Sequence, residues 1–243
     1  MLQACLNGAR HPGAHPALPV TPERLAEDAV AAAELGVTSL HLHPRDVVGL
    51  EVLAGPEVAT TVATVRAAVP GMEIGVTTAA AIEPNPYRRS ELIRSWAPLA
   101  SGRPDIASVN VHEGGWLDVA KILHEAGIGI ELGVFHLQAA RRLQHADIPP
   151  GTVRILAEVR PDKADPISEA EALLCELEPF GLPILLHGEG DSTWPVLTYA
   201  ARLELDTRIG LEDTLELPDG SSPRDNAQLI EQARRTRRAL APS

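Results

Sequence analysis

The chain has 243 residues, of which 44% are hydrophobic and 3% aromatic, and its formal net charge at pH 7 is -12. This length suits one large core of the size of a single α/β barrel. The negative charge argues against a nucleic-acid partner, whose phosphates require a basic face. No apolar run approaches the ~20 residues that a transmembrane helix needs, so no membrane partner is expected.

The N-terminus and the cysteines indicate the expected location. The first eight residues lack the basic start and the long apolar core of a signal peptide, and they predict a strand that ends in a turn. Cys5 and Cys175 are the only cysteines, and their spacing matches no metal or redox motif. We expect both thiols to be small buried hydrophobic groups, which favours a reducing, cytoplasmic setting.

Short β-branched runs alternate with longer segments of helical apolar spacing along the whole chain. Thr21 and Pro22 predict the start of the first helix, and Gly36 predicts its end. The predicted strands span residues 2–6, 37–43, 73–77, 106–111, 129–134, 153–159, 183–187 and 207–211. The predicted helices span residues 23–35, 56–68, 87–97, 116–126, 137–144, 166–177, 194–203 and 224–240.

Strands and helices that alternate in this way, without a linker or a break in composition, predict one α/β domain over residues 1–243. The number of evenly spaced units favours a closed (β/α)8 TIM barrel, and a doubly wound open sheet is the alternative. The active site of such a barrel lies at the C-terminal ends of its strands. This rule brings together His41, His43, Thr77, Thr78, Asn110, His112, Glu131, His187, Glu212 and Asp213.

His41 and His43 are separated by one residue, so a strand directs both imidazoles to the same side. Two imidazoles and one carboxylate form a common catalytic metal site, and Glu212 offers the carboxylate. Zn²⁺ is the expected metal, and the same ligand types also accept Fe²⁺, Co²⁺ or Mn²⁺. The alternative for the histidine pair is the solvated face of an edge strand.

Asp213 is a candidate base, and Arg208 is placed to hold an anionic group or to tune that base. The alternative for Glu212 and Asp213 is capping of the last helix, although Ser222 or Asp225 lies closer to its predicted start. Threonine and asparagine side chains at strand ends also satisfy turn backbones. We expect His187 to be a hydrogen-bonded core histidine, and we expect surface or loop positions for His11, His15, His124, His136 and His145.

Segments from both ends of the chain resemble the β-keto acid cleavage enzymes, the family of the 3-keto-5-aminohexanoate cleavage enzyme of lysine fermentation. Near the N-terminus these segments are ACLNGA at residues 4–9, HPALPVTPE at residues 15–23 and HLHPRD at residues 41–46. Near the C-terminus they are RIGLED at residues 208–213 and NAQLI at residues 226–230. The chain is similar to a short variant of this family.

The resemblance implies a zinc-dependent barrel, commonly a homotetramer, that acts as a carbon-group transferase. Such an enzyme condenses a β-keto acid with acetyl-CoA and cleaves the product by a retro-Claisen step to acetoacetate and a CoA thioester. The resemblance further implies zinc ligands at His41, His43 and Glu212, with Asp213 as the base and Arg208 as its partner. It implies substrate contacts at Thr77 or Thr78, Asn110 and Glu131.

The chain also departs from the family pattern. Ala79 follows the two threonines where a glycine is usual, the fifth strand lacks a second acid, and the sixth strand ends in Glu158-Val159-Arg160-Pro161 rather than in a glycine-rich turn. Two alternatives therefore stay open. One is a zinc barrel lyase or hydrolase that acts on a keto acid without CoA, and the other is a non-catalytic metabolite-binding barrel that has kept the metal site.

Overall fold

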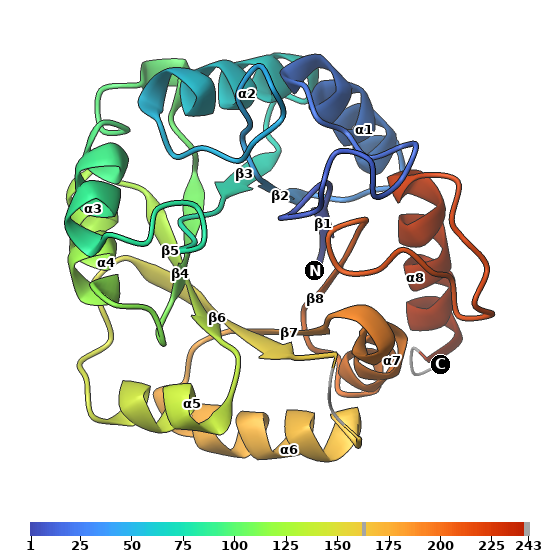
Figure 1. Ribbon diagram of the computed structural model, residues 1–243. Coiled ribbons are helices and arrows are strands. Elements are labelled where there is room, and N and C mark those ends of the chain that lie inside the picture. Colours follow the sequence, from blue (N-terminus) through green and yellow to red (C-terminus); the bar gives the residue numbers. More distant parts are fainter. Residues whose placement is uncertain (162–163, 241–243) are drawn as a thin grey trace.

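In the computed structural model, which describes residues 1–161 and 164–240, a ring of helices surrounds eight parallel strands (Figure 1). The strands are β1 (Leu2–Cys5), β2 (Ser39–Leu42), β3 (Glu73–Val76), β4 (Ile106–Asn110), β5 (Gly129–Val134), β6 (Thr152–Val159), β7 (Ile184–Gly188) and β8 (Thr207–Ile209). The α-helices are α1 (Pro22–Glu34), α2 (Gly55–Ala68), α3 (Pro86–Arg94), α4 (Trp116–Glu125), α5 (Leu137–Gln144), α6 (Pro166–Leu177), α7 (Thr193–Arg202) and α8 (Asn226–Leu240). This architecture confirms the predicted (β/α)8 TIM barrel.

The strands follow the order β7-β6-β5-β4-β3-β2-β1-β8. The seam between β7 and β8 is closed by a parallel bridge from Leu185 to Asp206, and the Leu186 N–H donates to the Asp206 carbonyl at 2.9 Å. In the ladder, β1 lies between β2 and β8, with Cys5 opposite His41 and Gln3 opposite Arg208. Closure therefore brings the histidine strand close to the C-terminal RIGLED segment.

The ends of α1 follow the sequence signals. The Thr21 hydroxyl accepts a hydrogen bond from the Arg24 N–H at 3.3 Å, and Pro22 is the first helical residue. Gly36, with φ +76°, follows the helix in the left-handed conformation that glycine adopts without steric cost. At the last helix, Asp225 accepts from the Gln228 N–H at 2.8 Å, so Asp225 has the predicted capping role.

The barrel interior is polar near the N-terminal ends of the strands. Arg154 on β6 pairs with Glu131 on β5, and its Nη2 lies 2.8 Å from Oε1 of Glu73 on β3. Burial alone would lower the pKa of Arg154, but the two glutamates raise it. Ser39 on β2 completes this layer by donating to Glu73 at 2.7 Å. Glu131 is thus part of a buried ion-pair layer beneath the mouth of the barrel.

Two further sequence expectations concern burial and membranes. Cys5 is buried, but Cys175 on α6 is exposed, so the expectation of two buried thiols is wrong for Cys175. The outward face of α6 carries this residue, and helical apolar spacing alone did not separate that face from the core. Among the described residues, none of the helices has the length and apolar character that crossing a membrane requires.

Candidate metal centre

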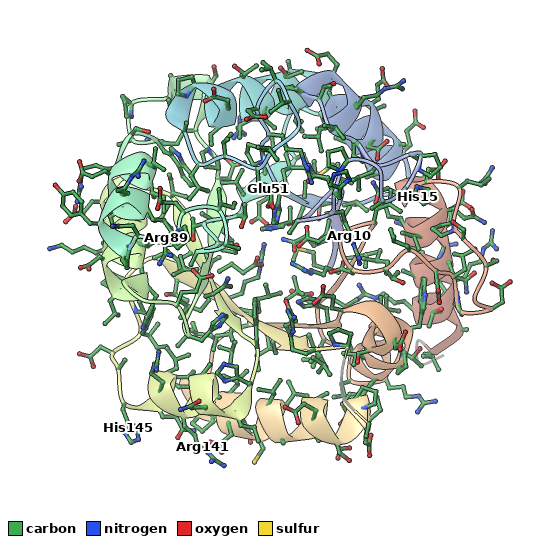
Figure 2. The ribbon with its side chains drawn as sticks, in the orientation of Figure 1. Arg10, His15, Glu51, Arg89, Arg141 and His145 are labelled. Atoms are coloured by element: carbon green, nitrogen blue, oxygen red, sulfur yellow. The ribbon has the colours of Figure 1, made fainter. Side chains whose placement is uncertain are left out.

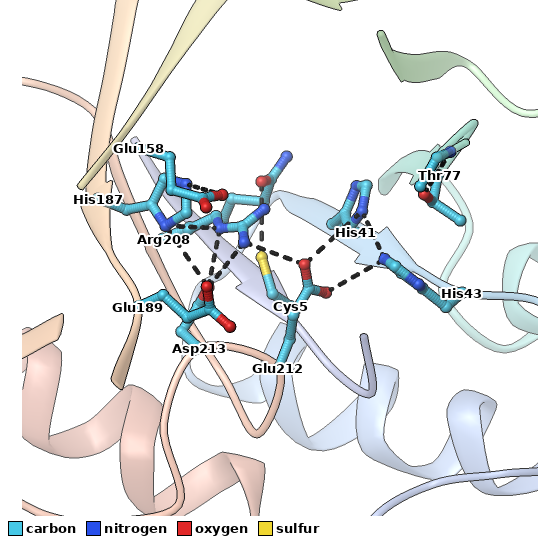
Figure 3. Close-up of polar contacts among 12 residues, drawn as sticks. Cys5, His41, His43, Thr77, Glu158, His187, Glu189, Arg208, Glu212 and Asp213 are labelled. Atoms are coloured by element: carbon cyan, nitrogen blue, oxygen red, sulfur yellow. Dashed lines mark hydrogen bonds and ion pairs between the residues drawn. The ribbon is translucent and has the colours of Figure 1, made fainter. Parts of the chain in front are cut away.

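His41 and His43 converge at the mouth of the barrel. His41 lies on β2, which is one residue shorter than predicted at this end, and His43 directly follows its last residue. Their Nε2 atoms are 3.2 Å apart, and the two rings are edge to face. Glu212 approaches from beyond β8, with Oε1 3.9 Å from Nε2 of His41 and Oε2 3.7 Å from Nε2 of His43 (Figure 3).

These separations suit a shared divalent cation. Two nitrogen or oxygen atoms that bind Zn²⁺ tetrahedrally at their usual bond lengths are about 3.3 Å apart. The three ligand atoms all lie within 4.8 Å of one another, so they need only small shifts to meet one ion. Oε2 of Glu212 is buried and accepts no hydrogen bond from the described residues. A cation at this point would satisfy that carboxylate oxygen.

The protonation states of His41 and Glu212 also suit metal binding. Burial lowers the pKa of His41 well below its usual value, and His43 and Arg208 lower it further. The imidazole is therefore neutral near pH 7, and neutral imidazole is the form that binds metals. Burial raises the pKa of Glu212, although Arg208 opposes this effect. A divalent cation would favour the ionised carboxylate.

Asn7 and Gly8, in the segment after β1, fix the geometry of this cluster. The Asn7 side chain accepts from the His43 N–H at 2.9 Å and donates to the His43 carbonyl at 2.9 Å. Gly8 has φ +55°, and a Cβ atom there would collide with the side chain of Glu212. The Asn-Gly pair therefore anchors His43 and leaves room for the carboxylate beside it.

The end of β8 differs from the prediction. The strand stops at Ile209 rather than continuing to residue 211, and the chain turns so that the Asp213 N–H donates to the Gly210 carbonyl at 2.9 Å. At Gly210 the backbone lies directly against the Cys5 carbonyl, where a side chain would not fit. Glu212 and Asp213 therefore project from a turn rather than from the end of the predicted strand over residues 207–211.

Arg208 connects the cluster of His41, His43 and Glu212 to a second group of buried polar side chains. Its Nη2 donates to Oε1 of Glu212 at 3.0 Å, and its Nε donates to Nδ1 of His187 at 3.1 Å. Nε2 of His187 lies 3.5 Å from Oε2 of Glu158. Figure 3 shows this continuous series of contacts from Glu158 to His41 and His43. Arg208 is therefore the side chain that joins Glu212 to His187.

Asp213 is enclosed at one end of this network. It is 0% exposed, its Oδ1 contacts Arg208, and its Oδ2 has no hydrogen-bond partner among the described residues. Burial would raise the pKa of Asp213, but Arg208 and His187 outweigh burial and lower it below its usual value. For Arg208, burial would lower the pKa, but Asp213 and other neighbours raise it. The pair is thus a carboxylate and a guanidinium at neutral pH.

A cavity of about 550 Å³ opens above the cluster. Of the predicted site residues, it is lined by His41, His43, Thr77, Asn110, His112, Arg208 and Glu212. Thr78 lies behind this wall, where its hydroxyl donates to the Ser108 carbonyl at 2.6 Å. Glu131 lies in the ion-pair layer below, and Asp213 lies behind Arg208. The structure therefore brings the three metal-ligand candidates and four further predicted residues to one cavity.

The family model for beta-keto acid cleavage enzymes matches residues 1–242 of the chain. The chain belongs to this family. No curated protein matches it in sequence. This β-keto acid cleavage family member is similar in structure to ObcA, which has been solved without ligand, with oxaloacetate, and with a C4-CoA adduct and oxalate.

The structural likenesses show the barrel fold. The ObcA structures are 19% identical with a TM-score of 0.64, and the matches cover 90% of this chain but only 61–63% of ObcA. The chain thus spans less than two thirds of the ObcA length. Type I 3-dehydroquinate dehydratase from Clostridium difficile has a TM-score of 0.67 at 11% identity, with 98% of this chain and 91% of that chain covered.

Several cavity residues of this β-keto acid cleavage family member are not among the predicted site residues. Glu158 lines the cavity with Leu156, since alternate residues of β6 face the same way, and Arg160, directly after the strand, also lines it. The predicted strand over residues 153–159 already implies this alternation. His136 caps α5 by accepting from the Ala139 N–H at 3.0 Å and also lines the cavity. His15 lies in a loop as predicted, but it is buried against the Pro223 carbonyl.

Proposed function

We propose that the chain is a metal-dependent transferase that condenses a β-keto acid with acetyl-CoA. A retro-Claisen cleavage then releases acetoacetate and a new CoA thioester. The observation that carries this proposal is the convergence of His41, His43 and Glu212 on one point at the cavity. Membership of the family supports a β-keto acid substrate. The ObcA complexes with oxaloacetate and with a C4-CoA adduct support keto acid and CoA ligands.

His41, His43 and Glu212 would hold the metal. Zn²⁺ is the proposed ion, and Fe²⁺, Co²⁺ and Mn²⁺ are alternatives because they bind the same types of ligand. A bound divalent ion would polarise the keto and carboxylate oxygens of the substrate and acidify the carbon between them. His41 and His43 approach from the β2 side of β1, and Glu212 approaches from the β8 side. Together they leave coordination positions open toward the cavity. A substrate oxygen can approach from that direction.

The acid–base role is assigned to Asp213 with Arg208 as its partner. The lowered pKa of Asp213 keeps it ionised, and its unpaired Oδ2 is available for a proton. Because Arg208 separates Asp213 from the cavity, the substrate proton has two routes to this base. The Arg208 side chain can move aside, or Glu158, which faces the cavity, can take the proton first and pass it through His187 to Asp213.

Thr77 and Asn110 are the proposed substrate contacts. The Thr77 oxygen accepts from the Ala79 N–H at 3.1 Å, which leaves its hydroxyl proton free to bind a substrate carboxylate. Asn110 donates to Glu113 at 2.9 Å and presents the rest of its amide to the cavity. Thr78 and Glu131 do not line the cavity, so we propose that they support it from behind and from below.

We further propose one catalytic domain over residues 1–243, a cytoplasmic location, and a homo-oligomer in the form of a tetramer or dimer. The absence of a recognisable cysteine motif supports the location. The exposed apolar side chains of Val47, Val48 and Leu50 after β2 support association between copies. Light scattering would measure the assembly. Neither a nucleic acid nor a membrane is proposed as a partner.

An activity screen tests the reaction. A panel of β-keto acids is supplied to the zinc-loaded protein with and without acetyl-CoA, and acetoacetate is measured. We expect acetoacetate only when both substrates are present. Product from the keto acid without acetyl-CoA would instead support a CoA-independent lyase or hydrolase. Tight keto-acid binding with no turnover across the panel would support a metabolite-binding barrel.

A further inference from the structure

The loop between β2 and α2 returns a carboxylate to the metal centre. Oδ1 of Asp46 accepts from the N–H groups of Val48 and Leu50, both at 2.9 Å, and the Asp46 N–H donates to the Leu50 carbonyl at 2.8 Å. Glu51 then pairs antiparallel with Arg45 through a single bridge. The loop is therefore a narrow hairpin, and Glu51 lies beside the segment that follows His43.

Arg45 fixes this hairpin to the rest of the barrel. The side chain is buried, and its Nη1 donates to the Gly49 carbonyl at 2.7 Å. Its Nη2 donates to the carbonyls of Gly8 at 2.8 Å and Arg10 at 2.6 Å, in the segment after β1. One guanidinium thus joins the hairpin to the chain that borders Glu212. Figure 2 shows Glu51 and Arg10 near the centre of the ring of helices.

Glu51 forms a hydrogen bond with Nδ1 of His43. A carboxylate accepts hydrogen bonds but does not donate them, so the ring proton of a neutral His43 is held on Nδ1. The Nε2 lone pair is then free on the opposite edge of the ring, where Glu212 and His41 lie. Among the described residues, no carboxylate forms a corresponding bond with Nδ1 of His41. The two histidines therefore differ in how they are oriented.

We propose that Glu51 is a positioning residue that orients His43 and raises the affinity of the centre for a divalent cation. This inference rests on the metal site of the proposed function. Glu51 does not line the cavity, and it contacts the ring edge away from Glu212, so it acts through His43 rather than as a ligand. Acceptors behind a metal-bound histidine fix its tautomer and raise its basicity, and their loss typically lowers metal affinity by 10–100-fold.

Zinc affinity in a competition titration with a chromophoric chelator tests the proposal. We expect Glu51→Ala to weaken Zn²⁺ binding by about 10–100-fold, and Glu51→Gln, which keeps an oxygen acceptor, to lose less. Val48→Ala perturbs the exposed tip of the same loop, and Glu57→Gln removes a charge from the first turn of α2, which follows that loop. Both control variants should bind zinc as the wild type does. Equal affinity in Glu51→Ala and wild type would overturn the proposal.

Two further measurements distinguish a failure of the Glu51 proposal from a failure of the proposed reaction. In the metal-free protein, ¹⁵N NMR should find the His43 ring proton on Nδ1, and Glu51→Ala should shift it toward Nε2. A wild-type ring protonated on Nε2 would overturn the role of Glu51. A protein whose zinc affinity depends on Glu51 but which forms no acetoacetate would support this inference and contradict the proposed reaction. A wild type that binds no zinc would overturn both.

Discussion

Arg208 contacts Asp213 at two points, with Nη2 2.8 Å and Nε 3.0 Å from Oδ1 of the carboxylate. The same Nη2 donates to Glu212 at 3.0 Å. One guanidinium therefore ties the proposed base to the proposed metal ligand, and its charge lowers the pKa of Asp213 against the effect of burial. The metal half and the acid–base half of the site are parts of one electrostatic unit.

Replacing Asp213 should impair catalysis without changing metal binding. Asp213→Asn keeps the shape of the side chain but removes the proton acceptor, so we expect turnover to fall by about 10²–10⁴-fold with zinc content unchanged. Steady-state kinetics and metal analysis measure the two quantities on the same preparation. A variant that keeps turnover within a few fold, while Glu158→Gln abolishes it, would contradict the assignment and move the proton to the carboxylate that faces the cavity.

Loss of a histidine ligand should remove both the metal and the activity. His41→Ala leaves two of the three ligand groups in an already buried site, so we expect loss of tightly bound zinc and of turnover. Metal analysis after dialysis measures the first effect. His145→Ala is the matched control, because His145 is exposed at the outer edge of the barrel (Figure 2). Activity in His41→Ala equal to that of the control would contradict the metal site.

The close approach of Gly8 to Glu212 makes a third prediction. Gly8→Ala imposes a side chain at φ +55° and a collision with the Glu212 side chain, so we expect lower stability and weaker zinc binding together. Gly71→Ala is the control, since Gly71 has φ +86° but nothing lies within 4 Å of its added Cβ. Both variants should lose about 1–3 kcal/mol of stability from backbone strain. Equal zinc affinity in the two would contradict the role of Gly8.

Asp28 on α1 predicts a pH dependence of stability that is independent of the site. Burial raises the pKa of Asp28 from 3.8 to about 6, although Asn226 donates a hydrogen bond to it at 2.7 Å. The folded state therefore binds the proton more tightly than the unfolded state. Protonated Asp28 therefore adds roughly 2–3 kcal/mol to the free energy of unfolding at low pH, relative to its ionised form at neutral pH. This stabilisation is lost as the pH rises from about 4 to about 6.

Urea denaturation of wild type and Asp28→Asn at pH 4.5 and pH 7.5 measures this effect. The asparagine keeps the acceptor for Asn226 but has no charge to bury, so the variant should gain stability over the wild type at the higher pH. A difference between the two proteins that stays constant with pH would show that Asp28 titrates normally in the folded state.

The barrel and the convergence of His41, His43 and Glu212 were predictable because their signals are local or follow from the fold class. The alternation of His41 and His43 needs only a strand, and the strand-end rule of the barrel supplies Glu212. The turn after β8 was not predictable, because it depends on the contact between Gly210 and the Cys5 carbonyl from the other end of the chain.

Partners that lie on other strands explain the remaining differences. Nothing in the fifth strand by itself indicates that Glu131 pairs with Arg154 of β6 below the cavity. The return of Glu51 to His43 depends on how Arg45 and Asp46 fold the intervening loop. Glu158 is a different case, because the sequence places it at a strand end just as it places the predicted site residues.

The most direct test of the central claim follows the acetyl group. Acetyl-CoA carrying ¹³C at the acetyl carbonyl carbon is supplied with a β-keto acid and the zinc-loaded protein, and the products are observed by ¹³C NMR. Condensation followed by retro-Claisen cleavage places the label at C3 of acetoacetate, and the acyl group of the keto acid appears as an unlabelled CoA thioester. Keto acid consumed while the label stays in acetyl-CoA or appears as acetate would contradict the proposed reaction.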